Sequence, residues 1–342
     1  MRFPVKPVRG AVLVALLAVF VSCNIHEWPA SPVFEEPYGL NLVFDTDLPL
    51  WDPQTEAPAK SGSAYAVKRG YMRYIVRAYP MQGGAPAPEW SEEFIFTREI
   101  SQGYDCKLTL ALPTGSYRLL VWADLTGEKD AAAYYDADDF EAIRLQGTHT
   151  GATDHRDAFF GSLDVDVVTY TGAHLTPSGV VEMQRPLAKF EFVTTDLASF
   201  LKKEAARMGA RATSAETFFD DYEVVISYDG YMPSVYSLIT GNPMDSSTGV
   251  QFRSSMRQLN DNEASLGFDY VFVSDLETSV TVRVSLFDKA TGAKLSQTAP
   301  VKVPLLRGRH TVVRGSYLLE NASGGVGIDP GYEGDNDIPF EF

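Results

Sequence analysis

Cysteine is scarce in this sequence, and so is positive charge. The 342-residue chain has two cysteines, Cys23 and Cys106, and its 29 Lys and Arg residues stand against 45 Asp and Glu residues, for a formal charge of −16. Two cysteines cannot build a disulfide scaffold or a four-cysteine zinc site. Nucleic-acid binding needs clustered Lys and Arg, so this charge balance argues against it.

Motifs of catalysis and cofactor binding are also missing. The sequence contains no P-loop, no GxSxG nucleophile elbow, no CxxC and no HExxH. One loop, residues 149–157, gathers His149, Asp154, His155 and Asp157. Such a set could hold a divalent metal, but polar loops produce similar clusters readily, and we favour a chance cluster over a metal site. We therefore predict that the protein is not an enzyme and has no catalytic residue, metal or other cofactor.

Long hydrophobic runs are limited to one near the amino terminus. Residues 11–21 form an unbroken apolar stretch of eleven residues, preceded by Arg2, Lys6 and Arg9. About 20 apolar residues are needed to cross a bilayer, so this pattern predicts a signal peptide and not a transmembrane helix.

The run ends in Phe20-Val21-Ser22-Cys23, which resembles the lipobox of bacterial lipoproteins. A small residue stands directly before the cysteine, although Phe20 departs from the usual leucine. We predict a lipoprotein signal peptide over residues 1–22 and lipidation of Cys23. An ordinary signal peptide with an incidental cysteine is the alternative.

Removal of residues 1–22 would delete three positive and no negative charges, which takes the formal charge from −16 to about −19. Such an acidic chain gains nothing from anionic lipid, so the acyl chains alone would hold it to the membrane. Residues 23–37, which include three prolines, are typical of a tether. Cys106 is left without a partner, and we expect it to be a small, half-buried apolar residue.

The body of the chain has the composition and periodicity of β-structure. Its 45% apolar and 12% aromatic residues can fill a packed core. Period-two alternation recurs between turn-rich pieces, which predicts many short antiparallel strands in sandwiches or open barrels. The clearest runs are 40–44, 74–79, 94–96, 106–112, 117–123, 187–193, 222–228, 269–273, 280–286 and 311–319.

One convincing helix interrupts the strands. Apolar residues recur at helical spacing from Leu197 to Met208, and Asp196 can cap the start. Because the apolar stripe is narrow, we expect this helix to cover a sheet edge instead of lying on a membrane.

A new β-run opens at Leu187, just after Arg185-Pro186, and we place a domain boundary there. The prediction is an N-terminal β-sandwich domain at 38–185 and a C-terminal one at 186–321. Residues 322–342 form a Gly- and acid-rich tail that ends in a short strand.

Several segments together resemble the fimbrillin-type lipoproteins of Bacteroides-like bacteria, and more narrowly a poorly characterised branch of that superfamily, a domain of unknown function. No single motif is diagnostic, but their order and spacing cover nearly all of the mature chain. The segments are 72–79, 113–124, 157–162, 185–192, 230–233, 267–272, 306–315 and 324–329.

The resemblance implies two transthyretin-like antiparallel β-sandwich domains, an all-β fold with one short helix in the second. It also implies lipidation at the cell outer membrane and a role in surface fimbriae. In such fimbriae a protease removes the first strand after an arginine or lysine, and a neighbour's terminal strand fills the groove.

Carried onto this sequence, the resemblance implies cleavage at Arg69, within Val67-Lys-Arg-Gly70. The strand to be replaced would carry Leu40, Leu42 and Phe44, and the donor strand would carry Ile338, Phe340 and Phe342. Two alternatives stay open: residues 40–44 remain paired in their own sheet, and the tail folds back on its own domain.

The leading hypothesis is a non-enzymatic fimbrillin-like surface lipoprotein, an anchor, tip or shaft subunit used in assembly or adhesion. Its expected partners are the outer membrane, other fimbrial subunits, and host or bacterial surface ligands. A second hypothesis is a glycan-binding lipoprotein of a nutrient-uptake system, with Trp51, Trp90 and Trp122 as a sugar-stacking platform. Exposed, clustered tryptophans would favour the second hypothesis, and a detachable strand over a groove would favour the first.

Overall fold

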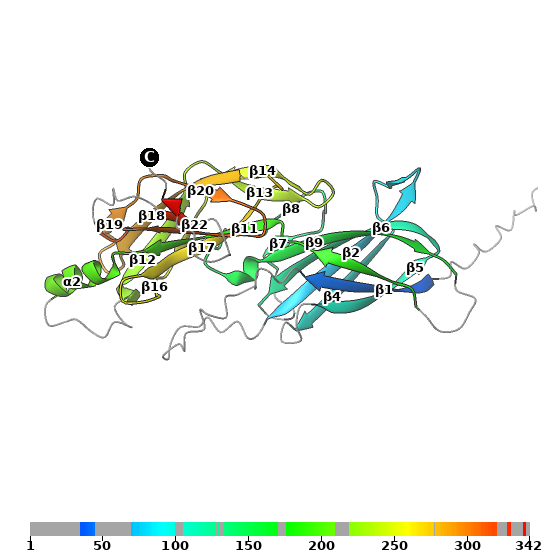
Figure 1. Cartoon of the computed structure of the whole chain (residues 1–342), viewed down its shortest axis with the longest axis horizontal. Helices are drawn as coiled ribbons and strands as arrows, with labels where there is room; N and C mark the ends of the chain where they lie inside the picture. The colour runs from blue at the N-terminus through cyan, green and yellow to red at the C-terminus, as the bar shows by residue number, and fades with distance from the viewer. Residues whose placement is uncertain are drawn as a thin grey trace, which may run out of the picture. The chain divides into compact units, whose positions relative to one another are not determined.

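The computed structural model describes residues 35–44, 70–99, 105–127, 129, 133–169, 176–208, 219–276, 278–319, 327–329 and 338–339. The chain divides into two compact units, Met1–Glu35 and Glu36–Phe342. Apart from Glu35, the first residue of β1, the described strands and helices lie in the second unit (Figure 1). Cys23 and Arg69 lie outside the described residues.

Two sheets surround the core of the N-terminal half. The larger has the strand order β3-β2-β6-β9, with β4 paired to β2, and the smaller has the order β10-β1-β5. Apolar side chains from both sheets, among them Leu40, Val76, Leu110 and Val121, form one buried cluster. The strands are β1 (Glu35–Phe44), β2 (Tyr71–Gln82), β3 (Ala85–Pro86), β4 (Glu92–Glu99), β5 (Cys106–Pro113), β6 (Gly115–Thr126), β9 (Ala158–Val167) and β10 (Ser178–Met183).

The C-terminal half repeats this plan around a second core. One sheet has the order β16-β17-β11-β21-β22-β23, and the other has the order β15-β12-β18-β19, with β20 paired to β18. Both contribute to one buried cluster. The strands are β11 (Leu187–Thr194), β12 (Tyr222–Tyr228), β15 (Gln251–Ser254), β16 (Arg257–Gln258), β17 (Ala264–Phe272), β18 (Thr278–Asp288), β19 (Lys294–Gln297), β20 (Val301–Leu305), β21 (His310–Gly315), β22 (Gly327–Asp329) and β23 (Ile338–Pro339).

A fifth sheet joins segments from both halves of the chain. It has the order β14-β13-β8-β7, built from β7 (Tyr135–Asp136), β8 (Ile143–Leu145), β13 (Tyr231–Ser237) and β14 (Asn242–Thr248). A third buried cluster likewise mixes Trp122 and Tyr135 with Leu187, Tyr236 and Phe272. The residues of one main core precede position 185 in the sequence, and the buried residues of the other follow it. The fifth sheet and the third cluster combine residues from both sides of that position. The domain boundary at 185/186 therefore stays a prediction.

The predicted all-β class, with one short helix in the second half, is confirmed. Among the described residues the single α-helix is α2 (Leu197–Met208), and the short 3₁₀ turns are η3 (Asp154–Arg156) and η5 (Phe219–Asp221). Leu197 and Phe200 are buried in the C-terminal core, where the Phe200 ring meets Tyr222 edge-on at 5.2 Å. The Asp196 carboxylate accepts hydrogen bonds from the backbone N–H groups of Leu318 and Leu319, which ties the start of α2 to the segment that follows β21.

A bulge bends β17 where it pairs with β11. The register shifts after Phe192, and Gly267 lies opposite that residue with φ +137°, a conformation that side-chain-bearing residues rarely adopt. A Cβ at Gly267 would lie 2.6 Å from Ser254 Oγ and 3.0 Å from Ile226 Cδ1. Glycine is therefore required here both by backbone conformation and by space.

None of the helices in the described part of the chain has the length and apolar character needed to span a bilayer.

Candidate strand-exchange site

Strand β1 lies in the middle of its sheet, between β10 and β5 (dark blue in Figure 1). It runs parallel to β10, with Gly39 opposite Ser178 and Phe44 opposite Met183. The Gly39 N–H donates to the Pro177 carbonyl at 2.7 Å, and the Phe44 N–H donates to Asp105 Oδ1 at 3.0 Å. A strand in this position forms hydrogen bonds on both of its edges, so its removal would leave a slot with two open edges.

Alternate side chains of β1 point into the N-terminal core. Leu40, Leu42 and Phe44 have exposed fractions of 0%, 1% and 4%, while Val43, on the opposite face, is 42% exposed. The Phe44 ring meets the Phe159 ring edge-on at a centroid distance of 4.9 Å. Burial of a large apolar side chain contributes about 1.5–3 kcal/mol, so these three side chains together contribute roughly 5–9 kcal/mol. The three residues predicted for the replaced strand thus share one buried face.

Close backbone contacts hold β9 and β10 together beside this strand. The backbones of Phe160 and Gln184 exchange two hydrogen bonds of 2.8 Å. A Cβ at Gly161 would lie 2.4 Å from Val181, and one at Gly179 would lie 2.4 Å from Leu163. Glycine at 161 and 179 therefore permits β10 to pack tightly enough to form one wall of the β1 position.

The tail strand pairs with its own C-terminal sheet. Strand β22 pairs antiparallel with β21, with Gly327 opposite Arg314, and β23 pairs with β22, with Ile338 opposite Ile328. Phe340 and Phe342 lie outside the described residues, as do Cys23 and Arg69. The donor strand, the cleavage site and the lipidation site therefore stay predictions.

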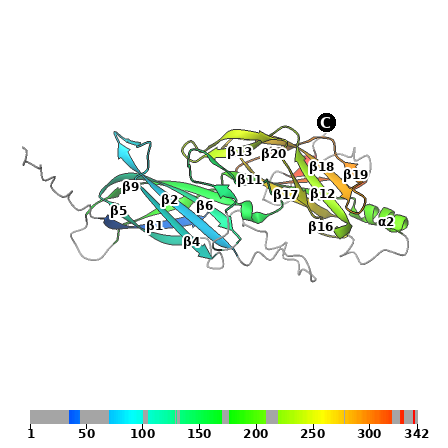
Figure 2. The same cartoon turned by 180° about the vertical axis from the view of Figure 1, so that it is seen from behind.

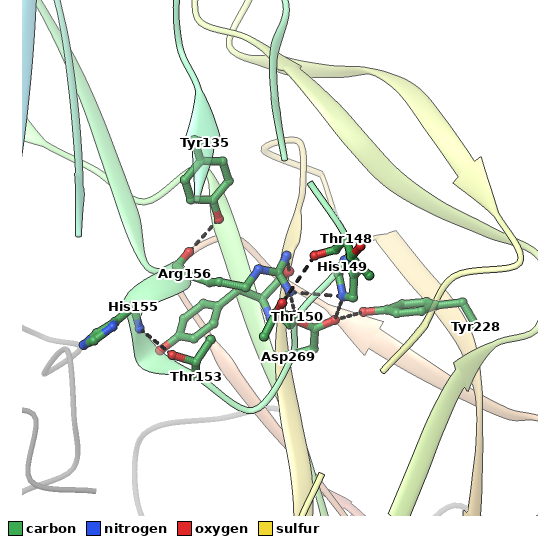
Figure 3. Close-up of polar contacts among 10 residues, drawn as sticks. Tyr135, Thr148, His149, Thr150, Thr153, His155, Arg156, Tyr228 and Asp269 are labelled. Atoms are coloured by element: carbon green, nitrogen blue, oxygen red, sulfur yellow. Dashed lines mark hydrogen bonds and ion pairs between the residues drawn. The ribbon is translucent and has the colours of Figure 1, made fainter. Parts of the chain in front are cut away.

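The loop at 149–157 forms part of a buried ionic network (Figure 3). Arg156, 2% exposed, forms an ion pair with Asp269 of β17, which is completely buried. Arg156 also donates from Nη2 to the Tyr270 carbonyl at 2.9 Å and from Nη1 to the Thr150 carbonyl at 3.2 Å. The network thereby links the loop to a strand of the C-terminal half.

Two more side chains lie within hydrogen-bond distance of the Asp269 carboxylate. Oδ2 accepts a hydrogen bond from Tyr228 Oη at 2.6 Å and lies 2.7 Å from His149 Nε2. Burial alone would raise the pKa of Asp269, but Arg156, His149 and Tyr228 outweigh it and hold the pKa below its ordinary value. Asp269 is therefore a structural anion at the centre of the network.

The other carboxylates of the loop are also paired with cations. Asp154 Oδ1 lies 2.8 Å from Lys189 Nζ, and Asp157 Oδ2 lies 2.9 Å from Arg185 Nε. Burial raises the pKa of Asp157 to about 6, although Arg185 acts in the opposite direction. Among the described residues no group of three or more His, Cys, Asp or Glu side chains is arranged to hold a metal ion.

Sequence reasoning missed Arg156 and Asp269. No burial was predicted for segment 149–157, whereas Arg156 and Asp157 are buried. The available signal was a charged residue inside an apolar strand: Asp269 interrupts the run from Gly267 to Val273. Buried charges are rarely left unpaired, so Asp269 required a cation from elsewhere in the chain.

The tryptophans are not gathered in the described structure. Trp122 is fully buried and donates from Nε1 to Asp124 at 3.0 Å, whereas Trp90 is 43% exposed beside the Arg77 guanidinium. Trp51 lies outside the described residues. A pocket of about 320 Å³ beside β9 and β10 is lined by Phe160, Gly161, Ser162, Val180, Glu182 and Gln184, without a tryptophan. No observation among the described residues favours the sugar-stacking platform.

Cys106 begins β5 and is buried, with 7% of its surface exposed, and it is a free thiol. Burial raises the pKa of this thiol, while hydrogen bonds with Arg98 and Tyr74 act against that rise. The expectation of a small residue packed with the apolar core is confirmed, and its burial is more complete than predicted.

The described chain is an all-β sandwich protein whose first strand is buried between two others. The chain belongs to a family of unknown function, DUF6562, whose model matches residues 35–341. Among curated protein sequences, none is significantly similar to this chain.

Solved structures provide a further comparison. The fimbrial anchor protein Mfa2 from Porphyromonas gingivalis is 12% identical, with 86% of this chain and 98% of that chain covered and a TM-score of 0.41. A fimbrial assembly protein from Parabacteroides distasonis is 11% identical, with coverage of 86% and 96% and a TM-score of 0.39. A candidate cell adhesion protein from Bacteroides ovatus is 10% identical, with coverage of 88% and 99% and a TM-score of 0.47.

Proposed function

We propose that this protein is a non-enzymatic, fimbrillin-like surface lipoprotein, anchored in the outer membrane through Cys23, that joins partner subunits by strand addition. The observation that carries the proposal is the position of β1, which lies between β10 and β5 with Leu40, Leu42 and Phe44 buried. Strand addition needs such a place, because main-chain hydrogen bonds supply affinity and pockets for alternate side chains supply specificity.

Covalent connectivity fits a removable first strand. Residues 45–69 connect β1 to β2, and Arg69 directly precedes Gly70 and the start of β2. Cleavage after Arg69 would leave β1 attached to the rest of the fold by non-covalent contacts alone. The same cut would break the covalent link to a lipid on Cys23, so a copy that also loses β1 would leave the membrane, whereas an uncleaved copy would stay anchored.

The sequence of the tail matches the pattern of the strand that it would replace. Leu40, Leu42 and Phe44 have the same spacing of two residues as the apolar set Ile338, Phe340 and Phe342. Residues at this spacing lie on one face of a strand. A tail from a neighbouring copy could therefore present three apolar side chains to the pockets that β1 fills.

The test uses the native protein recovered from outer membranes, with intact mass, N-terminal residue and size distribution measured together. The proposal expects lipid on Cys23 in uncleaved copies and a series of multimers extending beyond two copies in molecules that start at Gly70. Replacing Lys68 and Arg69 with alanine should abolish the series, and deleting residues 338–342 should abolish it without preventing cleavage. A C23A variant should leave the membrane fraction.

Two results would count against the proposal. Full-length, lipidated molecules that never form higher multimers would exclude a polymerising shaft subunit. Membrane retention of the C23A variant would contradict the lipid anchor.

A further inference from the structure

Strand β4 forms a border of the larger N-terminal sheet, as both views show (Figures 1 and 2). It pairs with β2 over its full length of 8 residues, from Glu92 opposite Ala78 to Glu99 opposite Tyr71. Among the described strands, β2 is the one that pairs with β4, so the other edge of β4 has no strand beside it. Unpaired N–H and C=O groups along an edge are a template for another strand.

This edge lacks two of the features that commonly prevent edge-to-edge pairing, proline and a bulge, although charged residues stand at both of its ends. The segment 92–99, EEFIFTRE, contains no proline or glycine, and its register with β2 has no bulge. Strand β14 is a contrast, because it contains Pro243 and its register with β13 shifts twice. Proline and bulges are common protections of an edge, and β4 has neither.

The centre of β4 is apolar and exposed. Ile95 is 60% exposed on the outer face, where it lies opposite Ile75 of β2. Phe94 and Phe96, on the inner face, are only partly buried against the N-terminal core. The side chains of a further strand beside β4 would cover part of the surface of all three.

Symmetry restricts how two copies of β4 can pair. In an antiparallel pair that continues the sheet across a two-fold axis, opposed residues must point to the same face, so an even-numbered residue meets another even-numbered residue. With Ile95 on the axis, Phe94 lies opposite Phe96, and Glu92 lies opposite Arg98. Both contacts occur twice by symmetry.

The neighbouring registers are worse matched. With Phe94 on the axis, Ile95 would lie opposite Glu93. With Phe96 on the axis, Phe94 would face Arg98, and Glu93 would face Glu99. Like charges directly opposite each other destabilise a sheet, whereas apolar and opposite-charge pairs stabilise it. The segment is therefore self-complementary in one register.

We infer that β4 is a self-association edge, at which two copies of this chain form a symmetric dimer by antiparallel β4–β4 pairing centred on Ile95. This dimer is separate from the proposed strand exchange, because it needs neither cleavage at Arg69 nor the tail. It would join two larger N-terminal sheets into one continuous sheet.

The test is sedimentation equilibrium of the full chain carrying C23A. This substitution removes the proposed site of lipid attachment. The uncleaved chain should dimerise in the micromolar range, and I95K should raise the dissociation constant at least tenfold. L276K is the matched control, since Leu276 is 76% exposed and lies far along the chain from β4. The L276K variant should dimerise like the parent. Circular dichroism should show that the parent, I95K and L276K have the same fold.

Two further variants test the register. I95C should give a disulfide-linked dimer under mild oxidation, because Ile95 would meet its own copy, while L276C should not. E92R places like charges opposite each other and should weaken the dimer several-fold. A parent chain that stays monomeric at 200 μM, or an I95K variant that dimerises like L276K, would overturn the inference.

Discussion

Replacement of Arg156 by methionine should destabilise the protein strongly. The substitution keeps an apolar side chain of similar length but removes the cation beside the fully buried Asp269. Loss of one partner of a buried ion pair costs about 3–5 kcal/mol, because the other charge remains buried without compensation. At about 2 °C per kcal/mol for a protein of this size, the melting temperature should fall by roughly 6–10 °C.

A matched control comes from the N-terminal sheet. Arg118 and Asp164 form an ion pair with nitrogen–oxygen distances of 2.6 and 2.7 Å, but their side chains are 38% and 55% exposed. An exposed pair contributes at most about 1 kcal/mol, so R118M should have little effect. Urea unfolding at pH 7, followed by circular dichroism, gives the free energy of unfolding for both variants.

The pH dependence tests the cause of the loss. Since the pKa of Asp269 is held below its ordinary value, its ion pairing contributes stability above about pH 4 that disappears as the pH falls. The difference between the parent and R156M should therefore shrink in acid, where Asp269 can take up a proton. If R156M is within 1 kcal/mol of R118M at pH 7, the charge-pair account of this network is wrong.

Three further predictions concern other parts of the chain. Burial raises the pKa of Glu191, but His310 and other neighbours outweigh burial and lower this pKa to about 2. An E191Q variant should therefore lose roughly 3 kcal/mol of unfolding free energy at pH 7. Urea titrations should show the difference between E191Q and the parent vanish as the pH falls from 4.5 to 2. Gly267→Ala should cost about 2–4 kcal/mol by overpacking and strain, whereas Gly292→Ala, at φ +69° with nothing within 4 Å, should cost about 1 kcal/mol in the same assay. Cys106 should react with a thiol reagent only after unfolding, and a rapid reaction of the folded C23A variant would contradict its burial.

Strand positions were largely predictable from alternation. The runs at 222–228 and 106–112 correspond to β12 and β5, and the helix from Leu197 to Met208 is present. Alternation failed where one face is not apolar: nearly all of β14 is exposed, and sequence reasoning gave no strand there. The run at 311–319 was drawn too long, because β21 ends at Gly315.

Pairing across long sequence separations was beyond the reach of pattern reading. A single sequence shows that Asp269 is a charge in an apolar strand, but not that Arg156 reaches it. The pairing of β8 with β13 is hidden for the same reason, since Ile143 and Tyr236 meet only in the folded chain. The candidate exchange site was partly accessible: the buried face of Leu40, Leu42 and Phe44 follows from alternation, whereas its place between β10 and β5 does not.

The parallel pairing of β1 with β10 also constrains the order of folding. Residues 39–44 pair with residues 178–183, so the three-stranded sheet cannot close until most of the N-terminal half has been synthesised. Contacts between distant parts of a chain slow folding, because the loop entropy is lost before the contacts form. We expect the pairing of β1 with β10 to form late in folding. The apolar face of β1 would stay exposed until then. Strand β1, the first of the described strands along the chain, would then be among the last to pair.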